Sequence, residues 1–116
     1  MFSTKAAQTT MGVDLARLVG CARSDREIVG GRYSIACYIS DSWPSLLYLA
    51  YKYRSDLKAA LLASTNLGGE NAHRGSVLGG IVSLSFGSTV EDWLEQLVGH
   101  QAIQSEIAAL LSLIAA

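Results

Sequence analysis

The chain has 116 residues, of which 50% are hydrophobic and 16% are charged, and its formal net charge is -1. Such an apolar chain is unlike a disordered protein, and its scattered Lys and Arg residues give no electrostatic reason to expect a nucleic-acid partner. The length fits one domain, which we expect at residues 11–116 after a disordered polar segment at residues 1–10.

The N-terminal segment and the cysteines indicate a cytoplasmic protein. Residues 1–10 lack the apolar stretch of a secretory signal. Cys21 and Cys37 match no metal-ligand spacing and are expected to be buried as small hydrophobic residues. The uncharged stretch 75–90 is shorter than the ~20 apolar residues of a spanning helix and is rich in glycine, so we expect no membrane partner.

The first half of the chain is predicted to contain two helices and one extended segment. A helix is expected over about residues 11–21, followed by a short capped turn at residues 24–27. Residues 32–40 alternate like a strand, but they have no second strand to pair with, so we interpret them as an extended segment. This segment leads into a helix over about residues 43–53, with Pro44 in its first turn.

The middle of the chain is predicted to contain a helical hairpin followed by a glycine-rich helix. Ser55 is the expected cap of a helix that stops at the glycine pair 68–69 and packs antiparallel on the preceding helix. Gly75, Gly79 and Gly80 then fall within one helical pattern. Because an interior glycine destabilises a helix, the three glycines predict close approach of another backbone and a deeply buried central helix.

Two more helices are predicted near the C-terminus. Ser88 and Glu91 form the pattern of a capping box, which opens a helix that ends at Gly99. The last helix repeats apolar residues along one face over residues 103–114. Together the patterns predict an all-α fold, a compact helical bundle of about five or six helices.

The loop at residues 66–75 is the most informative stretch for function. Its two glycines allow a sharp turn, and the polar residues that follow lie at a helix N-terminus, where free N–H groups attract anions. Such a loop suits a phosphate or a metal-bound ligand, although a glycine stop followed by polar caps also occurs in proteins without a ligand. Arg74 either meets a phosphate or lies on a solvated face.

The order of motifs resembles the C-terminal part of the ADP-ribosylglycohydrolase family. The resemblance is based on residues 36–44, 46–50 and 59–69, and it covers about residues 24–112. The loop, Gly-Gly-Glu-Asn in this chain, is similar to a branch of the family related to jellyfish lens crystallins. The resemblance implies hydrolysis of a glycosidic bond between ADP-ribose and a protein side chain or small molecule, with magnesium ions orienting the ribose and a water.

The family's acidic motif is only partly present in this chain. Glu70 falls on its first Asp, Ala72 on its second Asp and His73 on its Thr. The resemblance therefore implies an incomplete magnesium site with Glu70 and Asn71 as ligands, because alanine has no donor and magnesium prefers oxygen to nitrogen.

The resemblance also implies the residues that contact the substrate. Tyr38 falls where relatives present an aromatic side chain beside the pocket, and its alternative role is a core tyrosine. The implied substrate contacts are Tyr38, Asn66, Gly68, Gly69 and His73.

The family's second acidic cluster lies well upstream, and nothing in residues 1–35 resembles it. The chain therefore looks like a fragment or a short paralogue, inactive alone, whose site is completed by an N-terminal segment or a partner chain. Two alternatives stay open. One is a non-catalytic ADP-ribose-binding or structural module, and the other is a helical interaction module, such as a homo-oligomer, with apolar surface at its interface.

Overall fold

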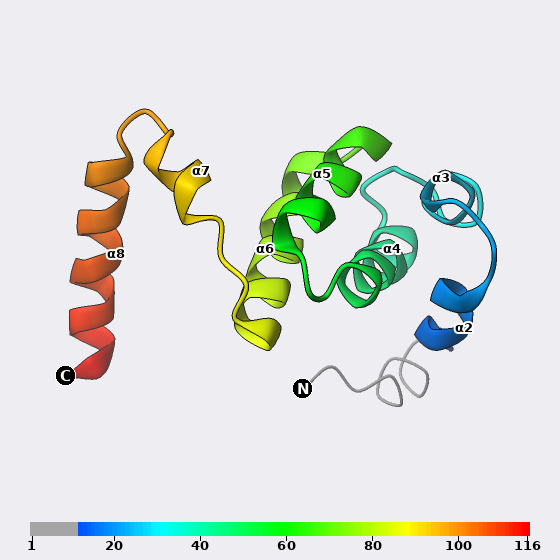
Figure 1. The fold of residues 1–116 in the computed structure, drawn as a ribbon, viewed down its shortest axis with the longest axis horizontal. Coiled ribbons are helices and arrows are strands. Elements are labelled where there is room, and N and C mark those ends of the chain that lie inside the picture. Colours follow the sequence, from blue (N-terminus) through cyan, green and yellow to red (C-terminus); the bar gives the residue numbers. More distant parts are fainter. Residues whose placement is uncertain (1–11) are drawn as a thin grey trace.

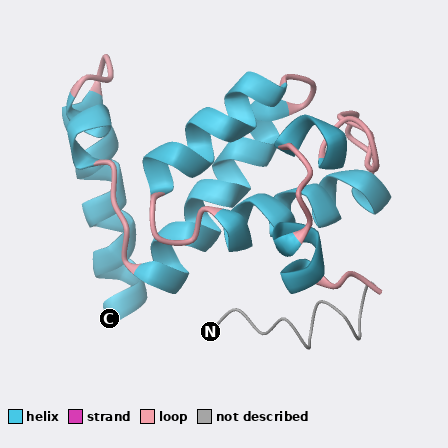
Figure 2. Cartoon of the chain, turned by 45° about the vertical axis from the view of Figure 1, so that its right-hand side comes forward, coloured by secondary structure: helices cyan, strands magenta, loops and turns pink. Residues whose placement is uncertain are grey.

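The structure is a computed structural model that describes residues 12–116, and this part of the chain contains helices and no strand (Figures 1 and 2). The seven helices are α2 (Leu15–Gly20), α3 (Asp25–Ile28), α4 (Ile39–Lys52), α5 (Leu57–Leu67), α6 (Asn71–Phe86), α7 (Glu91–Glu95) and α8 (His100–Ala115). The predicted all-α bundle is confirmed, and the additional helix, α3, forms at the predicted capped turn. The segment expected to be disordered, residues 1–10, lies outside the described residues.

The hydrophobic core surrounds α4, which contacts α2, α5 and α6. Figure 1 shows α5 and α6 side by side, with α4 between them and the α2–α3 end of the molecule. Burying one large apolar side chain stabilises a fold by about 1.5–3 kcal/mol. The largest completely buried apolar side chains are Tyr48, Leu15, Ile28, Leu49, Leu78, Val29 and Val82.

Helix α4 begins earlier than the sequence predicted. Pro44 is the sixth residue of α4 and does not lie in its first turn. The helix opens at the Tyr38 carbonyl, which accepts two backbone N–H groups at 3.0 and 2.8 Å. Proline removes only the N–H that would bond the Ser40 carbonyl, and Ser40 is exposed to water, so the helix continues through it. The extended segment predicted for residues 32–40 is shortened accordingly.

Helices α2 and α5 both begin at an aspartate. The carboxylates of Asp14 and Asp56 each accept the backbone N–H three residues later, at 3.0 and 2.9 Å. Helix α2 is therefore shorter than the predicted helix 11–21, and Ser55 is not the cap of α5. The capped turn predicted at residues 24–27 is confirmed, and it forms a capping box at the start of α3.

The prediction that the glycine-rich helix is deeply buried is wrong. Helix α6 buries one face only, through Arg74, Leu78 and Val82. A Cβ atom added at Gly75 or Gly80 would meet no atom within 4 Å. These two glycines therefore do not permit a close approach between helices in the described part of the chain.

The capping box predicted for the next helix does not form. The Ser88 hydroxyl instead accepts the Leu57 N–H at 3.3 Å, at the start of α5, and α7 has no side-chain cap. The expected partner, Glu91, is simply the first residue of α7. Helix α7 ends at Glu95, and Gly99, with φ of 78°, precedes α8 instead of ending the helix before it.

Helix α8 forms as predicted, but none of its residues is buried and it stands apart from the α4–α6 core (Figure 1). Its apolar residues Ile103, Ile107, Leu110 and Ile114 are between 37% and 72% exposed. The described residues include no helix with both the length and the apolar character needed to cross a membrane. The apolar side chains of α8 are therefore exposed and do not pack against the rest of the described chain.

A cluster around Asp25 connects α3 to the end of α4. Its carboxylate accepts hydrogen bonds from the Tyr48 hydroxyl at 2.7 Å, the Lys52 ammonium at 2.5 Å and the Tyr53 hydroxyl at 2.5 Å. The Lys52 ammonium also lies 5.6 and 5.4 Å from the centres of the two tyrosine rings. Burial alone would raise the pKa of the Asp25 carboxyl, but the three donors and the Lys52 charge outweigh burial and lower it.

Candidate functional site

The connection between α5 and α6 is a sharp turn made by two glycines, as the sequence predicted. Gly68 and Gly69 have φ values of 74° and 65°, a conformation that strains residues with a side chain. A Cβ atom on Gly69 would lie 2.3 Å from the carbonyl oxygen of Ile35. The same carbonyl accepts the Glu70 N–H at 3.1 Å. The loop is therefore fixed against the segment that precedes α4, and this contact requires glycine.

Arg74 supports the loop from the inside. It is only 4% exposed, so the prediction of a solvated face is wrong. Its guanidinium donates to the Ser64 hydroxyl at 3.0 Å, the Ser64 carbonyl at 2.9 Å and the Gly68 carbonyl at 2.7 Å. Burial lowers the pKa of this guanidinium below its ordinary value. A cation at the carbonyl end of α5 satisfies open acceptors and is favoured by the helix dipole.

Glu70 and His73 form a pair at the start of α6. The His73 Nδ1 atom lies 2.7 Å from a carboxylate oxygen of Glu70. The side chains of His73 and Glu70 are 88% and 44% exposed, respectively, so the pair is open to solvent on one side. A carboxylate on Nδ1 fixes the orientation of the ring and leaves Nε2 available to a ligand.

This pair lines a cavity of about 330 Å³ between the start of α4 and the start of α6. The volume lies at the lower end of the range for small-molecule sites. Ser42, Glu70, His73 and Arg74 supply its polar part. The remaining lining residues are Cys37, Ile39, Trp43, Leu46 and Val77. The cavity thus combines an apolar wall, which includes an indole ring, with one acidic and one imidazole group.

The other predicted site residues do not line this cavity. Tyr38 is the residue immediately before α4 and is 68% exposed, which excludes its alternative role as a core tyrosine. Its neighbours in sequence, Cys37 and Ile39, do line the cavity. Asn66 is exposed near the end of α5, where its carbonyl accepts a hydrogen bond from Arg26 at 3.3 Å. Gly68 and Gly69 shape the turn and do not contribute to the wall.

The predicted magnesium ligands lie next to each other in the chain but have separate partners. Glu70 pairs with His73, and the Asn71 side-chain amide donates to the Thr65 carbonyl at 3.3 Å. Within residues 12–116, no three His, Cys, Asp or Glu side chains come close enough together to hold a metal ion.

Sequence reasoning missed the apolar wall of the cavity. Trp43 is partly buried against the core and also faces the cavity. Ile39, Trp43 and Leu46 are spaced i, i+4 and i+7, which marks one face of a helix that begins at Ile39, four residues before the predicted start. The prediction that Cys37 is buried is wrong, because it is exposed, whereas Cys21 is half-buried.

Comparisons with known proteins identify the family of the chain. No curated protein matches the chain. No solved structure matches it either. The family model described as ADP-ribosylglycohydrolase matches residues 3–116, nearly the whole chain. The chain therefore belongs to the ADP-ribosylglycohydrolase family.

Proposed function

We propose that the cavity between α4 and α6 binds ADP-ribose as part of an ADP-ribosylglycohydrolase site. One observation supports this most directly. The pair Glu70 and His73, which falls on the family's acidic motif, lines the same cavity as the indole of Trp43. An aromatic ring offers a flat surface for a nucleobase or a ribose, and the carboxylate and imidazole offer hydrogen bonds to hydroxyl groups.

In this proposal hydrolysis of the glycosidic bond requires further carboxylates. Glu70 and the Asn71 amide oxygen are the magnesium ligands that this chain contributes, and a complementing N-terminal segment or partner chain supplies the others. The chain alone then binds ADP-ribose without cleaving ADP-ribosylated substrates. Its two free thiols support a reducing compartment such as the cytoplasm.

A non-catalytic module related to the lens-crystallin branch is the alternative within the family. The Gly-Gly-Glu-Asn loop and Ala72, which cannot bind a metal, support it. Magnesium distinguishes the two proposals, because a non-catalytic module has no reason to bind ADP-ribose more tightly when magnesium is present.

Calorimetric titration of ADP-ribose into the purified chain tests the cavity. We expect saturable binding that His73→Ala weakens at least fivefold, because the pair with Glu70 is lost. The chain has two histidines. His100→Ala is the matched control, since His100 begins α8 and does not line the cavity. This variant should bind ADP-ribose with the affinity of the wild type.

Magnesium should tighten binding in the wild type and have no effect in Glu70→Gln, which keeps the shape of the side chain but removes its charge. Absence of binding in the wild type, or equal weakening by both histidine substitutions, would contradict the assignment of the cavity.

The surface of α8 favours association as a second function. Ile103, Ile107, Leu110 and Ile114 are separated by four, three and four residues, the spacing of a coiled-coil seam. The helix contains a single carboxylate, that of Glu106, and no Lys or Arg, so two copies meet with little charge repulsion. We infer that two copies of this chain pair through α8.

Sedimentation equilibrium measures this association. We expect a dimer at micromolar concentration, and Leu110→Glu should convert it to monomers because it places two charges in the apolar seam. Ser112→Glu is the matched control. Two residues further along, Ser112 lies on the opposite side of the helix and should leave the dimer intact. A monomeric wild type at all concentrations would exclude the pairing.

A further inference from the structure

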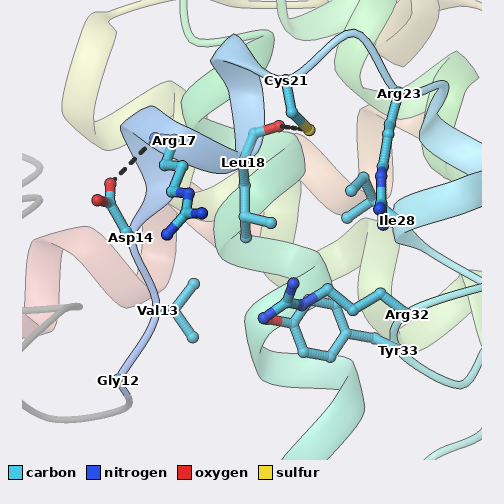
Figure 3. A pocket seen from close by; sticks show the side chains of 10 residues that line it. All are labelled: Gly12, Val13, Asp14, Arg17, Leu18, Cys21, Arg23, Ile28, Arg32 and Tyr33. Carbon is cyan, nitrogen blue, oxygen red and sulfur yellow. Dashed lines mark hydrogen bonds between the residues drawn. The ribbon is translucent and has the colours of Figure 1, made fainter.

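A second cavity, of about 310 Å³, lies between α2 and the segments on either side of α3, and it shares no lining residue with the first. Three arginines from different segments line it (Figure 3). Arg17 comes from α2, Arg23 from the turn before α3, and Arg32 from the loop after α3. In Figure 3 the side chains of Arg17 and Arg32 end near Val13, whereas Arg23 lies beside Ile28.

The positive charge of this cavity is not balanced by carboxylates. The only acidic residue in its lining is Asp14, whose carboxylate already caps α2. Within residues 12–116, none of the three guanidinium groups makes a salt bridge or a side-chain hydrogen bond. The preceding segment, residues 1–11, contains no Asp or Glu in its sequence, so it cannot supply a carboxylate either.

The three arginines are not equivalent. Hydrogen bonds from Ser24 lower the pKa of the Glu27 carboxyl, and the charge of Arg23 adds to this effect, so part of the Arg23 charge is compensated by Glu27. Arg32 lies with its guanidinium 5.6 Å from the centre of the Tyr33 ring, which leaves its N–H edge available. Arg17 and Arg32 therefore provide two guanidinium groups without an ion-pair partner among residues 12–116, in a cavity where three arginines outnumber one carboxylate.

We propose that this cavity binds the phosphate group of a small organic phosphate, with Arg17 and Arg32 donating to it. Two guanidinium groups match a dianionic oxyanion, because each presents paired N–H donors in the geometry of phosphate oxygens. The cavity is larger than a phosphate alone, and Val13, Leu18 and Tyr33 give it an apolar wall for the rest of the ligand. A phosphate there joins α2 to the segment after α3.

The site is independent of the proposed ADP-ribose cavity, and its test is separate. Inorganic phosphate and pyrophosphate are titrated into the full chain at constant ionic strength, and binding is followed by calorimetry and by the change in melting temperature. Constant ionic strength matters because exposed charges are screened by salt. We expect saturable binding of both probes and little binding of acetate, which carries one charge.

Arg17→Ala and Arg32→Ala should each weaken phosphate binding at least tenfold. Arg54→Ala is the matched control, because Arg54 also lies against a tyrosine ring, 4.9 Å from the centre of Tyr51, but outside the cavity. It should change the affinity less than twofold. Melting temperatures without phosphate verify that all three variants fold.

If all three substitutions weakened phosphate binding equally, binding would depend on the overall charge of the chain, and the proposed site would be wrong. Absence of phosphate binding by the wild type would overturn it as well. His73→Ala provides the comparison with the proposed function, since it should leave phosphate binding unchanged.

Discussion

Replacing Gly69 with alanine is expected to lower the free energy of unfolding by about 2–5 kcal/mol, because two costs combine. A left-handed backbone conformation costs a residue with a side chain about 1–2 kcal/mol, and overpacking a tight contact costs about 1–3 kcal/mol. Gly69 incurs both, because its φ is 65° and a Cβ atom would lie 2.3 Å from the Ile35 carbonyl oxygen and 2.6 Å from the Ile35 Cβ.

Urea denaturation of Gly69→Ala and Gly80→Ala measures this difference. Gly80 lies inside α6, and a Cβ atom there would have no neighbouring atom within 4 Å, so alanine should stabilise the chain by about 0.5–1 kcal/mol. Replacing glycine with alanine is thus expected to lower the free energy of unfolding at position 69 and to raise it at position 80. A loss below 1 kcal/mol in Gly69→Ala would show that the loop moves away from Ile35 at little cost.

The alanine at position 69 should also weaken ADP-ribose binding. The contact with Ile35 includes the hydrogen bond from the Glu70 N–H, and Glu70 is the residue that orients His73 in the cavity. Displacing the loop therefore displaces the pair. Gly80→Ala leaves the loop unchanged, so its affinity should equal that of the wild type.

The turn at Gly68 and Gly69 was predictable because only glycine adopts left-handed conformations without strain. The start of α4 was not, because a proline is usually confined to the first turn of a helix and here it is the sixth residue. That error moved the expected helix away from Ile39 and concealed the apolar wall of the cavity. The spacing of Ile39, Trp43 and Leu46 places them on one face of a helix, and it therefore indicates a helix that begins at Ile39.

Polar contacts between distant residues were the part of the structure that the sequence did not reveal. Arg74 is of a residue type usually found on the surface, and its burial depends on the open carbonyls at the end of α5. Arg17 and Arg32 are scattered in sequence but line one cavity after folding. Helical periodicity predicts which face of a helix is apolar, but it contains no information on such pairings between segments.

Replacing Asp25 with asparagine is expected to destabilise the chain by about 2 kcal/mol at neutral pH. The Asp25 side chain is 19% exposed, and it accepts hydrogen bonds from Tyr48, Lys52 and Tyr53. Hydrogen bonds to a charged acceptor contribute about 1.5–3 kcal/mol, and an amide has only one acceptor oxygen for the three donors. Tyr48 is 1% exposed, so its hydroxyl has no access to water as a substitute.

Asp92→Asn is the matched control, because Asp92 also pairs with a lysine that lies against an aromatic ring. Its side chain is 56% exposed, and the ammonium of its partner, Lys58, lies 5.5 Å from the centre of the Trp93 ring. Exposed ion pairs contribute little to stability since water competes for both groups. Urea denaturation should therefore separate the two variants clearly. Equal losses would show that the cluster around Asp25 has no special role.

The pH dependence of stability identifies the charge of Asp25 as the cause. Its pKa is lowered in the folded chain from an ordinary value of 3.8, so the stability it provides is present above pH 4 and is lost as the pH falls through the lowered value. The difference in free energy of unfolding between the wild type and Asp25→Asn should therefore shrink in this acidic range. At the other end, burial and the Asp25 carboxylate raise the pKa values of Tyr48 and Tyr53, so neutral tyrosines stabilise the fold up to pH 10 and this contribution declines above it. A difference between the two proteins that stayed constant from pH 7 to pH 2 would mean that asparagine acts through shape and not through charge.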